Sequence, residues 1–265
     1  ADVVHCHDVF FWYLPFRLLF PNKKVYTTFH GYEGNNIPNK RAIFMHKLSE
    51  KLSYGNICVG DFLKKWYGTK PTFVTYGAVD LQTIEKYIKE NKSSANFKNK
   101  IIYFGRLEYE AGILKYLEAL NILKKKGIDL ELDVYGEGSQ KEAVIEYGKE
   151  NNLKISLKGF IFNIESVLNN YDYVFCSRYL SMLEAMAFEK PIFAEYNNLI
   201  KKDYLQMAPF AKYISISKDA DGIANDFEEY LLEKKKLKIE NAYNFVKTET
   251  WEKMVNTYLE LWSVE

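Results

Sequence analysis

Several features are scarce in this sequence, and each scarcity narrows what the protein can be. No apolar stretch reaches the roughly 18 consecutive residues that cross a bilayer, and no charged and then apolar leader precedes Ala1. There is no low-complexity tract and no repeat of the solenoid type, which disfavours disordered and repeat architectures. We therefore expect a globular, cytoplasmic protein that is soluble or at most peripheral to the inner face of a membrane.

The sequence also has few cysteines. Cys6, Cys58 and Cys176 are odd in number, widely spaced and set in apolar runs. Cysteines of this kind are typical of buried thiols in a reducing compartment rather than of disulfides or a metal cage.

An excess of either charge is lacking too, because 36 Lys and Arg residues nearly balance 35 Asp and Glu residues. This balance does not indicate a nucleic-acid partner, and we expect none. The lysine runs at 124–126 and 234–236 are interpreted as solvated helix faces rather than as binding surfaces.

Short apolar runs alternate with longer amphipathic segments along most of the chain. Because each crossover between parallel strands needs its own helix, this alternation predicts an α/β fold with parallel sheets covered on both faces. The first strand, ADVVHCHD, has no earlier element to pair with, so we expect a missing segment upstream, and a short helix after it. The other expected strands cover residues 24–29, 56–60, 71–80, 101–105, 130–136, 155–159, 173–176, 191–194 and 213–216, and the expected helices cover 39–53, 64–67, 81 onward, 113–126, 140–151, 164–169, 181–188, 221–236 and 249–262.

A polar segment, KENKSSANFKNK, follows the helix expected after Leu81 and has few apolar anchors. Such a composition is typical of a boundary between domains. We predict a partial first α/β domain over residues 1–80, a helix and linker over 81–99, a second α/β domain over 100–248, and a terminal helix over 249–265.

The stretch from Tyr171 to Tyr196 has the pattern strand, polar turn, amphipathic helix, strand. In an open α/β sheet, ligands bind where a strand ends and the next helix begins, because the free N–H groups of the helix point there. The backbone from Ser177 to Met182 is therefore predicted to face an anion. Glu184 has two interpretations: it completes a capping box with Ser181, or it accepts hydrogen bonds from the two vicinal hydroxyls of a ribose.

Two other turns after strands are candidates. Gly105 allows a tight turn, and Arg106 beside it presents a planar fork of donors suited to a phosphate, although a salt bridge between domains fits equally well. The segment Gly136-Glu137-Gly138-Ser139 could bring the backbone close to a nucleotide. It lacks the third glycine of a dinucleotide fingerprint, however, and a plain strand-to-helix turn is the stronger interpretation of these residues alone.

The four histidines allow several roles. His30 ends the run TTFHG, at a strand's carboxyl end, where it could donate to a substrate oxygen or accept a proton. His5 and His7 share a face of the first strand, but no third or fourth ligand has metal spacing, so a structural or surface role is favoured over a metal pair. His46, inside a helix, is interpreted as structural.

Taken together, these segments resemble the retaining glycosyltransferases of family 4, which have the GT-B fold of two Rossmann-like domains. The most specific parts are LEAMAFEKPIFA, after a strand and loop, and then GRLE at the head of the second domain. The final helix, with Trp251 and Trp262, resembles the family's terminal helix, which packs back on the first domain. The likeness runs in order through DVVHCHD, TTFHG, FVTYGAVD, IIYFGRLE, LDVYGEGS, LKGF and LEAMAFEKPIFA.

The resemblance implies a GT-B protein with an incomplete first domain that transfers a hexose, with retention of configuration and without a metal or other cofactor. The donor would be a nucleotide diphosphate sugar of UDP or GDP type, and the acceptor a glycan, a lipid-linked molecule or a small molecule. Arg106 would hold the diphosphate, Glu184 the ribose, and His30 would lie near the transferred sugar; these three are the predicted catalytic residues. The predicted donor-binding residues are Gly105, Arg106, Gly136, Glu137, Gly138, Ser177, Arg178, Tyr179, Leu180, Ser181, Met182 and Glu184.

The sequence departs from the family pattern at three points. Ala111 stands where the family usually has a lysine, and Cys176 stands where it has the first of two glutamates. The first domain also lacks its opening strands and glycine-rich loop. These departures favour a second hypothesis, a nucleotide-sugar or glycan binding protein or partner subunit that kept the fold without catalysis. A nucleotide-sugar epimerase of related fold is a third, which the EAMA stretch disfavours.

A lipid-linked acceptor at a membrane surface is one form of the first hypothesis. Aromatic and basic residues in the first half would favour it, although such residues more often form a core and a solvated face. They are Phe10, Phe11, Trp12, Arg41, Lys47 and Lys51.

Overall fold

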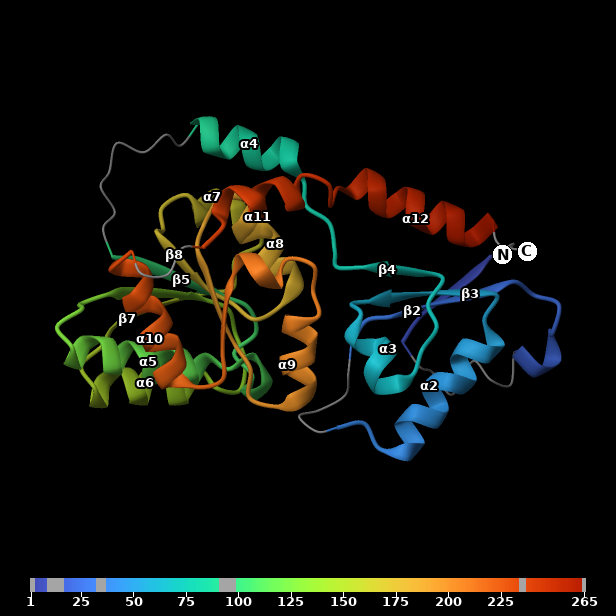
Figure 1. The fold of residues 1–265 in the computed structure, drawn as a ribbon, viewed down its shortest axis with the longest axis horizontal. Helices are drawn as coiled ribbons and strands as arrows, with labels where there is room; N and C mark the ends of the chain where they lie inside the picture. The colour runs from blue at the N-terminus through green and yellow to red at the C-terminus, as the bar shows by residue number, and fades with distance from the viewer. Residues whose placement is uncertain (1–2, 9–16, 32–36, 91–98, 234–236, 264–265) are drawn as a thin grey trace. The chain divides into compact units, whose positions relative to one another are not determined.

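The computed structural model describes residues 3–8, 17–31, 37–90, 99–233 and 237–263. The chain divides into two compact units (Figure 1): the first comprises Ala1–Ala78, Asn198–Ala208 and Trp251–Glu265, and the second Val79–Asn197 and Pro209–Thr250. Several predictions fall wholly or partly outside the described residues. They are the helix expected after the first strand, of which residues 17–19 are described and helical, the aromatic residues Phe10, Phe11 and Trp12, most of the polar linker and the lysine run at 234–236.

The first unit is built on a parallel sheet with the order β1-β2-β3-β4. All residues of β2 are buried, because this strand has a neighbour on each side and helix α2 packs against it. The two threonines of β2 tolerate burial because Thr27 bonds the hydroxyl of Ser53 and Thr28 bonds His5 and Tyr258. The elements are β1 (Val4–His7), β2 (Val25–Phe29), β3 (Gly55–Val59), β4 (Phe73–Thr75), α2 (Lys40–Leu52), α3 (Phe62–Tyr67), α9 (Leu199–Gln206) and α12 (Trp251–Ser263).

Helix α9 belongs to the first unit although its residues follow the last strands of the second in sequence. The carboxylate of Asp203 accepts a hydrogen bond from the indole of Trp66 at 2.9 Å and pairs with Lys65 at 2.6 Å. The ring of Tyr204 lies edge-on to Phe62 at 5.3 Å. The predicted second domain, residues 100–248, thus included a segment that packs elsewhere, because distance along the chain does not reveal this excursion.

Helix α12 packs on the sheet of the first unit through both apolar and polar contacts. Leu261 is fully buried and shares a core with Tyr26 and Ile57. The phenol of Tyr26 donates to the backbone carbonyl of Trp262 at 3.0 Å, and the indole Nε1 of Trp262 donates to Nδ1 of His5 at 2.9 Å. This last bond requires a neutral His5, since Nδ1 must act as the acceptor.

The second unit contains a parallel sheet with the order β10-β9-β8-β5-β6-β7. Figure 1 shows α5, α6 and α10 on one face of this sheet and α7, α8 and α11 on the other. The strands are β5 (Lys100–Phe104), β6 (Glu131–Tyr135), β7 (Lys154–Gly159), β8 (Tyr173–Phe175), β9 (Ile192–Glu195) and β10 (Ser215–Ser217). The helices are α4 (Leu81–Glu90), η1 (Tyr109–Ala111), α5 (Ile113–Lys125), α6 (Lys141–Glu150), α7 (Glu165–Leu168), α8 (Tyr179–Ala187), η2 (Ala211–Tyr213), α10 (Ala220–Leu231) and α11 (Ile239–Val246).

The core of the second unit lies between the sheet and helices α5 and α10. Phe227 of α10 packs against Phe193 of β9 at 4.7 Å, and Tyr116 of α5 stacks on Phe175 of β8 at 4.7 Å. Aromatic pairs at these separations add to the stabilisation that comes from burial of their area. None of the helices in the described segments is long and apolar enough to span a bilayer.

Most predicted elements are present, and the errors are local. The expected strand at 71–80 is only three residues long, at Phe73–Thr75, and the strand expected at 213–216 begins at Ser215 after a short 3₁₀ helix. Helices α9 and α11 were not predicted. Each has eight residues, about two helical turns, so neither offers a long enough apolar period to be distinguished in the sequence.

Gly112, at the start of α5, has a backbone conformation and surroundings that favour glycine. Its φ angle is +78°, and a Cβ atom there would lie 1.7 Å from Oε1 of Glu195, the buried last residue of β9. Gly127 has a similar φ of +83°, but nothing lies within 4 Å of its Cβ position. The two glycines therefore separate backbone strain from steric overlap.

Alanine substitutions at these two glycines should destabilise the protein to different degrees. Gly127→Ala should lower the free energy of unfolding by about 1–2 kcal/mol, the cost of a left-handed alanine. Gly112→Ala should lose that amount and about 1–3 kcal/mol more from overpacking. Urea denaturation of both variants measures the difference, and equal losses would show that Glu195 can move aside.

The bond between His5 and α12 should make stability depend on pH. Burial, and then the neighbouring rings of His7 and His30, lower the pKa of His5 from 6.5 to about 4. Between these values the unfolded chain binds the proton and the folded chain does not, so the free energy of unfolding should fall as the pH drops from 6.5 to 4. Urea denaturation across this range should show that the free energy of unfolding of His5→Gln changes less with pH than that of wild type. An identical pH dependence would contradict the lowered pKa of His5.

Candidate functional site

A small pocket lies where the strand order of the second sheet reverses. The chain runs from β5 to β6 and β7 on one side and from β8 to β9 and β10 on the other, and ligands of open α/β sheets bind at the carboxyl ends of strands at such a point. The pocket has a volume of about 20 Å³, room for roughly one water-sized group. Its lining consists of Tyr103, Phe104, Gly105, Arg106, Ala111, Cys176, Ser177, Arg178 and Ser181.

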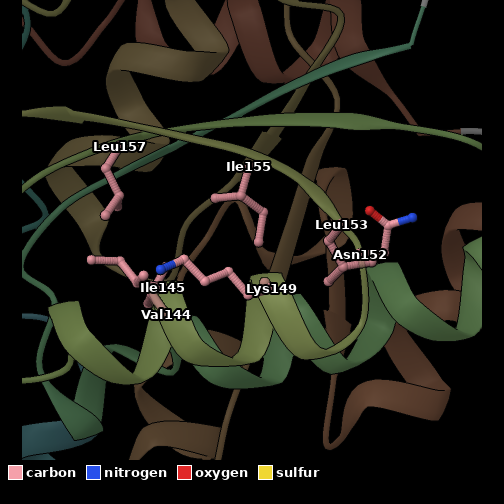
Figure 2. A pocket seen from close by; sticks show the side chains of 8 residues that line it. Val144, Ile145, Lys149, Asn152, Leu153, Ile155 and Leu157 are labelled. Carbon is pink, nitrogen blue, oxygen red and sulfur yellow. The ribbon is translucent and has the colours of Figure 1, made fainter.

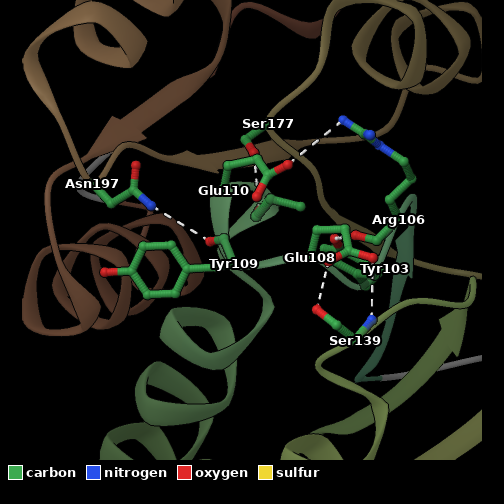
Figure 3. Close-up of polar contacts among 9 residues, drawn as sticks. Tyr103, Arg106, Glu108, Tyr109, Glu110, Ser139, Ser177 and Asn197 are labelled. Atoms are coloured by element: carbon green, nitrogen blue, oxygen red, sulfur yellow. Dashed lines mark hydrogen bonds and ion pairs between the residues drawn. The ribbon is translucent and has the colours of Figure 1, made fainter. Parts of the chain in front are cut away.

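Arg106 follows β5 and is held through its backbone. The phenol of Tyr103 donates to the Arg106 carbonyl at 2.9 Å, while the Arg106 side chain is 70% exposed and lies 3.9 Å from the carboxylate of Glu110 (Figure 3). A pair this exposed contributes little stability, so the guanidinium can reorient toward a ligand. The alternative prediction for Arg106 was a salt bridge between domains, but the acid that it pairs with, Glu110, lies in the same unit and in the same turn.

A buried hydrogen bond joins the two loops that form the pocket. Ser177, after β8, donates from its hydroxyl to the carbonyl of Ala111 in η1 at 3.2 Å (Figure 3). Ser177 and Ala111 are both buried, as is Cys176 next to them. Burial, and then the charge of Glu184, raise the pKa of the Cys176 thiol well above its ordinary value. The position of the family's first glutamate therefore holds a neutral thiol.

Helix α8 begins earlier than the sequence suggested, which removes the predicted capping box. Its first residue is Tyr179 and its N-cap is Arg178, so Ser181 lies inside the first turn instead of preceding it. The side chain of Arg178 forms no capping hydrogen bond. The N-terminus of α8, which lies beside the pocket at Ser177 and Arg178, therefore has no carboxylate cap from Glu184.

Glu184 lies one turn after Ser181, and residues three apart share a face of a helix. Burial, and then the carboxylate of Glu165, raise the pKa of Glu184 from 4.5 to about 8. Glu184 in turn raises the pKa of Cys176, which lines the pocket, so the two side chains are within electrostatic reach. Glu184 is thus a partly buried acid near the pocket that keeps its proton at neutral pH.

The glycines after β6 are required by close backbone packing. A Cβ atom on Gly136 would lie 1.9 Å from the carbonyl of Gly105, and one on Gly138 would lie 2.5 Å from the carbonyl of Leu107. These contacts alone account for glycine at both positions, as expected for a plain strand-to-helix turn. They also show that this turn packs against the turn after β5. Glu137 is exposed and pairs with Lys141 at 2.9 Å.

A carboxylate fixes the start of the next helix beside this turn. Glu108 accepts hydrogen bonds from the backbone N–H of Ser139 at 3.1 Å and from its hydroxyl at 2.5 Å (Figure 3). This pair was not predicted, because its members are far apart along the chain. Glu108 therefore ties the turn after β5 to the turn that precedes α6.

The remaining predicted residues do not all lie near the pocket. Tyr179 and Met182 of α8 are buried and Leu180 is exposed. His30 belongs to the first unit, where its ring accepts or donates a 2.7 Å bond to His7 and its backbone N–H donates to Asp8. His46 is buried between Phe29 and Tyr67, at ring separations of 3.8 and 4.3 Å, as expected for a structural residue.

For His5 and His7 the sequence favoured a structural or surface role over a metal pair. His5 and His7 lie on one face, with ring centroids 5.2 Å apart. Among the described residues, however, no group of three or more His, Cys, Asp or Glu side chains is arranged to hold a metal ion.

A larger cavity of about 330 Å³ lies at the edge of the second sheet, between α6 and β7 (Figure 2). Its walls are mostly aliphatic, and Lys149 and Asn152 are its polar side chains (Figure 2). It contains no acid, histidine or cysteine, so it offers no group for acid–base or nucleophilic chemistry. The chemistry-bearing side chains of this unit instead gather around the switch-point pocket.

The family model for glycosyl transferases group 1 matches residues 85–245, more than half of the chain. The chain belongs to this family. The match covers β5 to β10 and therefore every residue that lines the switch-point pocket. No curated protein matches the sequence.

Solved structures of glycosyltransferases share the fold. TarM, known from S. aureus, is 17% identical with a TM-score of 0.70 and covers 98% of this chain, which spans 54% of TarM. A glycosyltransferase from Rickettsia africae ESF-5 is 18% identical with a TM-score of 0.71. The match covers 99% of this chain and 76% of the Rickettsia chain. Anabaena HepE in complex with UDP is 12% identical with a TM-score of 0.71, and the match covers 91% of this chain and 72% of HepE. The two parallel sheets and these neighbours identify the fold as GT-B.

The raised pKa of Glu184 gives a test within the free protein. In the unfolded chain this carboxyl loses its proton near pH 4.5, but in the folded chain it keeps the proton up to about pH 8, so wild-type stability should fall as the pH rises between these values. Glu184→Gln is neutral throughout and should gain stability relative to wild type as the pH rises.

Urea denaturation at pH 5 and at pH 8 measures this difference. Glu146→Gln, which removes an exposed carboxylate on α6, controls for the change in charge. A difference between Glu184→Gln and wild type that is the same at both pH values would contradict the buried, protonated state.

Proposed function

We propose that this protein is a glycosyltransferase of family 4 type, which moves a hexose from a nucleotide diphosphate sugar to an acceptor with retention of configuration. The observation that carries the proposal is the switch-point pocket within the family-matched region, bordered by Arg106 and the start of α8. The departing group of such a donor is a diphosphate, whose growing negative charge needs cations and N–H dipoles rather than a nucleophile. No metal or other cofactor is required in this proposal.

Each donor-binding residue has a stated task. The Arg106 guanidinium would leave Glu110 and bind the diphosphate, and the N–H groups at the start of α8 would face the same anion. Glu184 would accept hydrogen bonds from the ribose hydroxyls, which favours its ionised form. The turn at Gly136–Gly138 would lie near the nucleotide. A role for His30 beside the transferred sugar stays a prediction.

The solved structures support the choice of donor and acceptor classes. Anabaena HepE was crystallised with UDP, and also with UDP and glucose. The S. aureus TarM variant structure contains UDP and alpha-GlcNAc-glycerol. We therefore propose a UDP- or GDP-linked sugar as donor and a glycan, lipid-linked or small-molecule acceptor for this chain. Arg41, Lys47 and Lys51 are exposed on α2, and their contact with a membrane surface stays a prediction.

A second candidate function is nucleotide-sugar or glycan binding without turnover. It is favoured by Ala111 and Cys176, which line the pocket where the family has a lysine and a glutamate. The thiol of Cys176 is buried and neutral, so it cannot act as the negatively charged hydrogen-bond acceptor that a glutamate would provide.

Nucleotide binding should be detectable and should depend on Glu184. At a concentration of about 100 times the dissociation constant, UDP or GDP should add about 2.7 kcal/mol to the stability of the chain. Wild type should prefer the ribonucleotide over its 2′-deoxy analogue, and Glu184→Gln should reduce that preference. Thermal shift and calorimetric titration measure these effects; failure of wild type to bind either UDP or GDP would overturn the proposal.

Hydrolysis of the matching donor sugar separates the two candidate functions. The transferase is supported if wild type releases the nucleotide diphosphate from the donor and Arg106→Ala does not. Binding without any turnover supports the binding protein.

A further inference from the structure

Arg178 is a partly buried arginine that lines the switch-point pocket and has no acidic partner within the described part of the chain. Its guanidinium forms no ion pair or hydrogen bond with any residue in the described ranges. Arg106, which lines the same pocket, is more exposed and has Glu110 at 3.9 Å. A partly buried cation costs free energy unless an anion compensates it, so an unpaired guanidinium at a pocket indicates a site for a negatively charged ligand.

The position of Arg178 relative to Ala111 is fixed by the neighbouring residue. Ser177 bonds the Ala111 carbonyl at 3.2 Å, which holds the β8–α8 loop against η1. Ala111 and Arg178 both line the small pocket, on the two loops that this bond joins. The guanidinium of Arg178 can therefore supply positive charge to the same pocket that a lysine at position 111 would reach.

Two further features favour an anion at this place. Burial, and then the charges of Glu195 and Cys176, raise the pKa of the Tyr103 phenol, whereas the charges of Arg178 and Arg106 both lower it. Both guanidinium groups are therefore within electrostatic reach of the same side chain of the pocket. Arg178 is also the N-cap of α8, a nine-residue helix, whose first N–H groups carry partial positive charge. The two arginines and the helix end form one electropositive edge.

We propose that the Arg178 side chain is a principal cation for the donor diphosphate and takes the place of a lysine at position 111. This inference rests on the proposed donor-binding function. Arg106 must give up Glu110 before it can bind phosphate, whereas Arg178 has no such competitor. Arg178 is therefore expected to contribute more to diphosphate affinity than Arg106, although its side chain does not stand in the GRLE motif.

The test compares the affinity of variants for UDP and GDP by calorimetric titration. Loss of a charge-assisted contact corresponds to about tenfold to a hundredfold weaker binding, and Arg178→Ala should fall in this range. Arg106→Ala should lose less. Arg178→Lys should retain part of the affinity, because it keeps the charge without the planar fork. Arg41→Ala, which removes an exposed cation of the first unit, is the matched control and should bind as wild type does.

The double variant Ala111→Lys/Arg178→Ala tests the replacement directly. A positive charge restored at position 111 of the same pocket should recover most of the affinity that Arg178→Ala loses. Unfolding midpoints without nucleotide identify any variant that fails to fold, and Arg178→Lys then provides the comparison.

The outcomes separate this inference from the function on which it rests. If wild type binds nucleotide and Arg178→Ala binds it equally well, the role of Arg178 is overturned and the proposed function stands. A double variant that binds no better than Arg178→Ala overturns the replacement of the lysine. If wild type binds neither UDP nor GDP, both the proposed function and the role of Arg178 are overturned.

Discussion

Strands β5 and β8 lie side by side and parallel in the second sheet, but the strands that follow them lie on opposite sides of this pair. The chain leaves β5 toward β6 and leaves β8 toward β9, so the loops at their carboxyl ends diverge and leave space between them. The switch-point pocket forms in that space, with a turn from each strand as its walls. Both arginines and the start of α8 occupy their positions because of this divergence.

Burial sets the charge of the region around the pocket. Glu184 and Cys176 keep their protons at neutral pH, because a partly or fully buried acid is more stable in its neutral form. Arginine remains charged in any such environment. Glu184 and Cys176 therefore add no negative charge beside the two arginines of the free protein, although Glu110 lies 3.9 Å from Arg106. The ribose-binding role proposed for Glu184 couples ligand binding to loss of a proton.

The sequence predicted the fold well where strands and helices are long. The runs at residues 24–29, 56–60 and 101–105 became β2, β3 and β5, because parallel strands buried on both faces have continuous apolar sequences. It failed for α9 and α11, which are short, and for the start of α8. The pattern Ser-x-x-Glu at 181–184 matches a capping box, but the helix extends to Tyr179 because the buried contacts of α8 already include that residue.

The sequence alone determined the parallel α/β architecture, the turn positions after strands and the residues that resemble a glycosyltransferase donor site. Those features depend on local pattern, which residue types and spacings record directly. Only the tertiary structure decided that Arg178 has no ion-pair partner among the described residues, that Ser177 joins its loop to Ala111, that α9 belongs to the first unit and that Glu184 is protonated. Contacts between distant segments, and the desolvation that they cause, depend on all neighbours in space and not on periodicity along the chain.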